Sequence, residues 1–159
     1  MSRWLVAWLL SSLAGTLLHF VYGWWPNALT AIFTPVNESV WEHLKLLFWP
    51  YLAAAWLLVR REREPWPAWT GHLAALLSMP VLLLGVYYAL KAGFGFERLW
   101  FDLALYYLSM AAGFVLARHI GQHSSGRCAA ALLLPVCVYA LLLTLFSFAA
   151  PNLPVFVSV

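Results

Sequence analysis

Charged side chains are scarce in this sequence. Only 9% of its 159 residues are charged, whereas 64% are hydrophobic. A soluble domain has about a quarter of its residues charged and about half of them apolar, so these few charges cannot cover a water-exposed surface of this size. The excess of apolar residues excludes an ordinary soluble domain and predicts an integral membrane protein, with residues 1–159 forming a single transmembrane domain.

Cysteine is also rare. The chain has only Cys128 and Cys137, and both lie within one apolar run. A helix would hold them more than a turn apart, too far for a disulfide, so we expect buried free thiols. The sequence also lacks a soluble segment in which basic and aromatic residues alternate. The formal net charge of +3 therefore gives no reason to expect a nucleic acid partner.

Long apolar runs separated by short polar segments predict an all-α bundle of about five transmembrane helices. We expect spans at about residues 4–22, 36–61, 69–91, 99–117 and 128–149. Residues 28–33 are apolar but too few to cross. Thr34 and Pro35 are typical of a helix start, so we expect the second long helix to begin there and Pro50 to kink it. The first apolar run continues past its small residues, which favours a retained helix over a signal peptide.

The basic residues predict the orientation of these helices. Six arginines lie at one set of predicted ends, whereas Lys45, Lys91 and Arg98 lie at the other. Cytoplasmic loops of membrane proteins carry an excess of Lys and Arg. We therefore expect the N-terminus in the cytoplasm and the C-terminus outside.

Residues 37–45 concentrate chemically capable side chains at the start of the second predicted helix. They include two of the six acidic residues and one of the five histidines of the chain. If this segment is helical, Glu38, Glu42 and Lys45 share one stripe, and Ser39 and His43 share another. An ion-paired stripe at an interfacial helix start is one interpretation of the first group.

The predicted topology brings further polar residues to the same depth. His19 lies near the outer end of the first span and Asp102 near the outer start of the fourth, with Arg98 and Lys91 beside it. Ionisable groups at membrane depth are costly and usually face a cavity or a partner. We therefore expect a shared polar site at the non-cytoplasmic side.

Acid, base and amide groups in this site suggest catalysis or metal binding. Carboxylates and histidines can ligate a divalent metal ion or transfer protons, although their spacing matches no closed metal signature such as His-Glu-x-x-His. The candidate catalytic residues, which are also the candidate metal ligands, are Glu38, Glu42, His43 and His19. The candidate substrate-binding residues are Asn37, Ser39, Trp41, Lys45, Asp102 and Arg98.

Two motifs carry a family resemblance. Residues 19–24 (His-Phe-x-Tyr-x-Trp) and residues 36–46 (Val-Asn-Glu-Ser-Val-Trp-Glu-His-Leu-Lys-Leu), followed by Pro50, resemble the DUF6512 family of small prokaryotic membrane proteins. The tyrosine pair at 87–88 and Asp102 also fall where that family has a tyrosine-rich span and an aspartate. The resemblance implies a multi-pass protein of a prokaryotic cell (inner) membrane. It implies no activity.

Three functions are compatible with these residues. The first is a membrane-embedded hydrolase or transferase, metal-dependent in one version, that acts on a lipid or amphipathic substrate from the outer leaflet. The second is a homo-oligomeric carrier or channel in which Glu38, Glu42 and Asp102 bind a proton, a cation or a small solute. The third is an accessory subunit that uses the polar segment to dock a partner. The variety of acids, bases and amide donors favours the enzyme.

Overall fold

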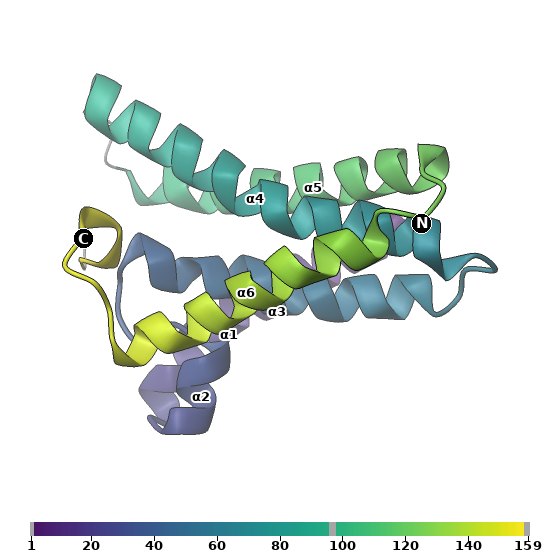
Figure 1. Cartoon of the computed structure of the whole chain (residues 1–159). Helices are drawn as coiled ribbons and strands as arrows, with labels where there is room; N and C mark the ends of the chain where they lie inside the picture. Colours follow the sequence, from purple (N-terminus) through teal and green to yellow (C-terminus); the bar gives the residue numbers. More distant parts are fainter. Residues whose placement is uncertain (1, 96–97, 158–159) are drawn as a thin grey trace.

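The computed structural model describes residues 2–95 and 98–157, which form helices and no β-strand. Four of the helices are long and apolar enough to cross a membrane: α1, Pro65–Lys91 of α4, α5 and α6. The predicted all-α class of membrane protein is therefore confirmed, whereas the count of five spans and their orientation stay predictions. The elements are α1 (Arg3–Trp24), α2 (Ala28–Phe33), α3 (Val40–Val59), α4 (Pro65–Phe94), α5 (Leu99–His123), α6 (Ala129–Phe148) and the 3₁₀ helix η1 (Pro154–Phe156) (Figure 1).

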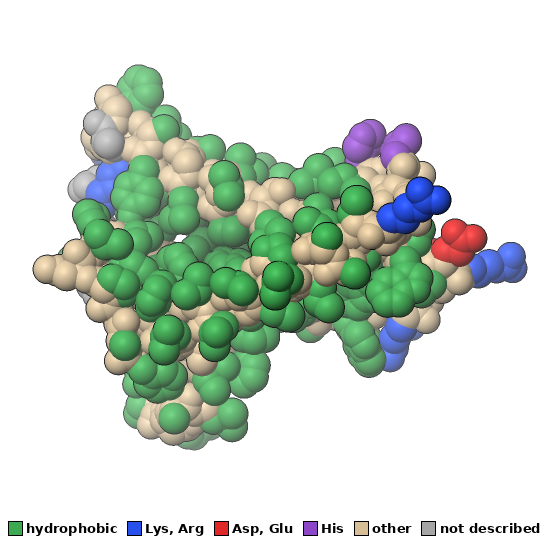
Figure 2. Space-filling view, in the orientation of Figure 1, with side chains coloured by type: hydrophobic (Ala, Val, Ile, Leu, Met, Phe, Trp, Pro, Cys, Tyr) green, Lys and Arg blue, Asp and Glu red, His purple; other side chains and the backbone are tan. Residues whose placement is uncertain are grey.

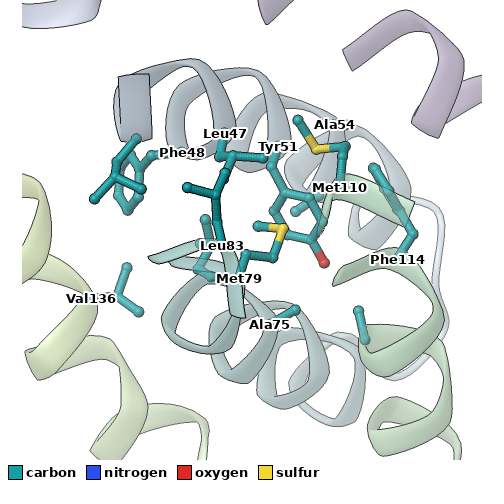
Figure 3. Packing of buried hydrophobic residues seen from close by; sticks show 14 of the residues in the cluster. Leu47, Phe48, Tyr51, Ala54, Ala75, Met79, Leu83, Met110, Phe114 and Val136 are labelled. Carbon is teal, nitrogen blue, oxygen red and sulfur yellow. The ribbon is translucent and has the colours of Figure 1, made fainter. Parts of the chain in front are cut away.

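The helix α3 forms the centre of the bundle and packs against α1, α4 and α6. Thirteen of its residues are buried, whereas α1 and α6 each bury three. A helix enclosed by other helices has little contact with lipid, so α3 can carry a polar first turn. Its apolar side chains interdigitate with those of α4, α5 and α6 (Figure 3). They include Leu47, Phe48, Tyr51 and Ala54, which lie near Met79, Leu83, Met110, Phe114 and Val136.

The start of α3 differs from the predicted one. Thr34 ends α2, where its N–H donates to the carbonyl of Thr30, and does not cap the next helix. The prediction that a helix starts at Thr34 and Pro35 is therefore wrong. The N-cap of α3 is Ser39, whose hydroxyl accepts from the N–H of Glu42. Ser39 and Glu42 have the Ser-x-x-Glu spacing that is common at helix starts, and this local signature prevails over Pro35.

Two smaller expectations also fail. Cys128 and Cys137 are free thiols as expected, but they are exposed on the protein surface and not buried. The reason is that α6 packs through a narrow face and leaves most of its circumference uncovered. In addition, α5 continues to His123, six residues beyond the expected end of its apolar run.

A buried histidine links four helices near the end of the bundle where the chain begins. His72 of α4 is 1% exposed, and its Nδ1 lies 3.0 Å from the hydroxyl of Tyr51 in α3. That hydroxyl donates to the carbonyl of Gly113 in α5, so His72 must donate to Tyr51 through Nδ1. The ring of Trp4 in α1 stacks on the imidazole at 5.5 Å. These contacts fix α1, α3, α4 and α5 to one another.

The helices α4 and α5 approach closely at Gly71. A Cβ at this position would overlap the carbonyl oxygen of Ala117, so the two helices would have to separate. We expect Gly71→Ala to lower the free energy of unfolding by about 1–3 kcal/mol. The matched control is Gly85→Ala in the same helix, where a Cβ meets nothing within 4 Å. Reversible unfolding in mixed detergent micelles measures both variants, and equal stabilities would contradict this packing.

Candidate functional site

The residues predicted to act together divide into an exposed cluster and a buried pair. Glu38 lies in the loop between α2 and α3, and its side chain is 65% exposed. Glu42 lies within α3 and is 2% exposed. Helical spacing does not apply to a residue that precedes the helix, so the predicted common stripe of Glu38, Glu42 and Lys45 is wrong.

The exposed cluster joins Glu38 to two histidines from different helices. One carboxylate oxygen lies 3.8 Å from Nε2 of His19 in α1, and the other lies 3.5 Å from Nε2 of His43 in α3. The two imidazole rings have their centroids 5.2 Å apart. Each of the three residues offers a ligand atom, and these atoms all lie within 4.8 Å of one another. The three side chains can therefore bind one cation together.

The hydrogen bonding of His43 determines what its ring presents to Glu38. Its Nδ1 lies 2.7 Å from the carbonyl oxygen of Ser39, and a carbonyl can only accept, so Nδ1 carries the hydrogen. In neutral imidazole the other nitrogen is then an unprotonated acceptor. The Nε2 lone pair of His43 faces a carboxylate, and two such groups attract each other only with a positive charge between them. Either a proton or a metal ion can supply that charge.

Asp102 lies at the edge of this cluster, in the first turn of α5. Its carboxylate is near enough to Lys91 of α4 and to His43 for their charges to act on it. Lys91 also donates to the hydroxyl of Tyr87 at 3.2 Å. Arg98 is the exposed N-cap residue of α5. The structure therefore brings His19, His43 and Asp102 to one end of the bundle.

Lys45 is fully buried beneath the exposed cluster. Its ammonium lies 2.7 Å from Glu42 and donates to the carbonyl oxygens of Ala31 at 2.6 Å and Thr34 at 3.2 Å. It also donates to the hydroxyl of Ser147 in α6. The ammonium has only three hydrogens and already has four acceptors within hydrogen-bond distance. Lys45 therefore has no donor left for a ligand.

Glu42 is enclosed in the same way. One oxygen accepts from Lys45 and from the backbone N–H of Val36, at 2.9 Å. The other accepts from the hydroxyl of Ser147, also at 2.9 Å. The pair thus ties α2, the following loop and α6 to the first turns of α3. We therefore assign Glu42 a structural role instead of catalysis or metal binding, and Lys45 a structural role instead of substrate binding.

The other predicted binding residues support the loop and the aromatic packing. The side-chain oxygen of Asn37 accepts from the N–H of Ser39 at 2.9 Å, which closes a local turn. Ser39 caps α3 and orients His43 through its carbonyl. Trp41 turns away from the cluster and packs in an aromatic group with Tyr139, Phe146 and Phe156.

Sequence reasoning missed Ser147, the partner that α6 supplies to the buried pair. It lies 105 positions from Glu42 in an apolar helix, and a single serine there resembles any small polar residue. It also missed the hydrogen bond between Tyr51 and His72. No local pattern indicates either contact, because each depends on how the helices pack.

The buried pair predicts an unequal response to substitution. Lys45→Met leaves the Glu42 carboxylate buried without its cation, so we expect a loss of about 3–5 kcal/mol in the free energy of unfolding. Glu42→Gln/Lys45→Met removes both charges and should be more stable than Lys45→Met alone. Unfolding in mixed micelles provides the measurement. Arg3→Gln breaks the exposed bridge to Glu62 as a control and should cost less than about 1 kcal/mol. A double variant no more stable than Lys45→Met would contradict the assignment.

Comparison with known proteins gives a family and no activity. No curated protein and no solved structure matches the chain. The model of a family of unknown function, DUF6512, matches residues 2–159. The match includes both motifs that suggested the resemblance and extends through α6. The chain therefore belongs to the DUF6512 family.

Proposed function

We propose that this protein is a metal-dependent hydrolase or transferase of a prokaryotic cell membrane, with its centre at His19, Glu38 and His43. The observation that carries the proposal is that ligand atoms of His19, Glu38 and His43 all lie within 4.8 Å of one another, with Nε2 of His43 3.5 Å from the Glu38 carboxylate. A metal ion between them would be held by the two imidazoles and the carboxylate together. The substrate class we infer is a lipid or an amphipathic molecule of the outer leaflet.

The donor set suits a zinc ion. Two imidazoles and one carboxylate form the protein ligands of several catalytic zinc sites, which leave a fourth position open. Zinc bonds of about 2.0–2.1 Å at tetrahedral angles place ligand atoms about 3.3 Å apart. One ligand atom from each of the three residues lies within 4.8 Å of the other two, so side-chain movements would have to shorten these separations to reach this spacing. The carbonyl of Ser39 would fix the ring of His43, as outer hydrogen bonds commonly do for metal-bound histidines.

A bound metal ion would supply Lewis acidity and an activated water molecule. The chain itself offers groups for the remaining steps. We assign proton transfer to Asp102, whose carboxylate is near enough to His43 for the two charges to interact. Since Lys45 is buried in its ion pair, we assign the holding of an anionic substrate group to Arg98, the exposed N-cap residue of α5.

The location of the cluster supports a membrane-derived substrate. Trp24, Trp25 and Trp100 are exposed at this end of the bundle, as expected where helices meet the headgroup region. The last part of α4 packs loosely, since none of its described side chains after Leu83 is buried. Figure 2 shows the surface hollowed between this part of α4 and the segment that carries η1. An acyl chain could enter there from the bilayer.

The packing at the middle of the bundle favours an enzyme over a carrier or channel formed within a single chain. Apolar side chains of α3 and its neighbours fill this region (Figure 3). A conduit within one chain, from Glu38 to the arginine-rich loop at 60–64, would have to pass through them. The proposed centre needs no such passage, because it opens toward one membrane surface.

Elemental analysis of the purified, tag-free protein tests the metal centre. After equilibration with zinc and removal of the excess, we expect about one zinc ion per chain in the wild type, as three protein ligands to one ion require. Glu38→Gln/His43→Ala removes two of these ligands and should abolish the stoichiometric zinc. His119→Ala/His123→Ala alters a histidine pair outside the cluster and should keep it. Equal and substoichiometric zinc in all three proteins would contradict a metal-dependent enzyme.

Lipid turnover tests the catalytic part. We expect the zinc-loaded protein, in mixed micelles with a bacterial lipid extract, to convert at least one lipid to a product that mass spectrometry detects. Asp102→Asn should keep its zinc and slow this conversion by about 10²–10⁴-fold, as loss of an acid/base group does. Glu64→Gln, remote from the cluster, serves as the control. A wild-type protein that holds zinc but converts no lipid would contradict the proposed substrate class.

A further inference from the structure

A second group of charged residues lies at the opposite end of the bundle from His19. Arg3 and His19 are sixteen positions apart in α1, which corresponds to about 24 Å of helix. Figure 2 shows basic and acidic side chains together at this end, where the N-terminus lies in Figure 1. None of these residues belongs to the proposed metal centre.

These charged residues surround a cavity of about 700 Å³. Sites for small ligands commonly have volumes of about 300–1,000 Å³. The first turn of α1, the loop between α3 and α4, the start of α4 and the last turns of α5 form its walls. Four elements distant in sequence thus line one open hollow at the surface.

The cavity carries a surplus of positive charge. Four arginines and two glutamates line it, so two positive charges remain. Arg3 and Glu62 form a salt bridge with each other. Among the described residues, Arg61, Arg63 and Arg118 form no salt bridge. These three guanidinium groups are therefore available to an anion.

Membrane orientation explains why arginines occur at this end but not why they share a cavity. Arg60 and Arg127 lie at the same end and do not line it. Arg60 instead stacks over Trp56 at 5.0 Å. By contrast, Arg61 comes from the α3–α4 loop and Arg118 from α5, and both line the same cavity. Only tertiary packing brings these two distant residues together.

The walls of the cavity strengthen its attraction for an anion. Trp4, Pro67 and Ala117 are among the lining residues, and apolar walls weaken the screening of charge by water. The ring of Trp4 is fixed in position because it stacks on the buried His72. Guanidinium groups match the geometry of phosphate oxygens and bind them through paired hydrogen bonds. A doubly charged phosphate group would neutralise the surplus charge.

We propose that this cavity binds a phosphate-bearing anion through Arg61, Arg63 and Arg118. The ligand is either the headgroup of an anionic lipid or a soluble phosphorylated molecule. The proposal does not depend on the activity proposed for the opposite end.

Pyrophosphate serves as the soluble probe, titrated calorimetrically into the protein in phosphatidylcholine nanodiscs. We expect Arg61→Gln/Arg118→Gln to weaken pyrophosphate binding at least tenfold. The matched control is Arg60→Gln/Arg127→Gln, which removes the same charge from the same end and should bind like the wild type. Thermal unfolding of both variants verifies that they remain folded.

Native mass spectrometry provides the lipid arm of the experiment. Retention of phosphatidylglycerol by the wild type, and its loss in Arg61→Gln/Arg118→Gln alone, would identify a lipid headgroup as the ligand. Selective loss of pyrophosphate binding without any difference in lipid retention would identify a soluble phosphate compound. If the two double variants behave alike in both assays, the cavity is not an anion site and the proposal is overturned.

Discussion

The ion pair between Glu42 and Lys45 is the interaction on which this end of the structure depends. Two charges removed from water are tolerated only when hydrogen bonds satisfy them, and here α2, the following loop and α6 supply those bonds. The requirement works in both directions. The pair needs these segments for its own stability, and the segments are held against α3 because the pair would otherwise be unsatisfied.

The candidate centre follows from this anchoring. The loop between α2 and α3 is fixed at Val36, through its bond to Glu42, and at Ser39, which caps α3. Glu38 lies between these fixed points and projects outward to His19 and His43. Two neighbouring acidic residues thus have opposite roles, since Glu42 stabilises the fold and Glu38 remains accessible. A buried carboxylate enclosed by its own protein is poorly suited to catalysis, whereas an exposed one beside two imidazoles is well suited to it.

Composition and the long apolar runs were sufficient to predict the all-α membrane class, because both depend on the solvent that surrounds the chain. The concentration of polar residues at 37–45 could be read directly from the sequence. Counting helical spans then placed His19 and His43 at the same membrane depth. The exposure of Glu38 and the burial of Glu42 could not be predicted that way. It depends on whether the helix begins at Thr34 or Ser39, where competing capping signatures lie a few residues apart. The role of Ser147 was equally inaccessible, because it arises from the docking of α6.

The central claim is that Glu38, and not Glu42, faces the two histidines. Rotational-echo double-resonance NMR tests it directly, on protein that carries ¹³C-carboxyl glutamate and ¹⁵N-imidazole histidine. The histidine nitrogens should dephase one glutamate carboxyl signal, and this signal should disappear from Glu38→Gln, an exposed substitution that leaves the buried pair intact. A dephased carboxyl signal that survives in Glu38→Gln would place another glutamate beside the histidines and contradict the account.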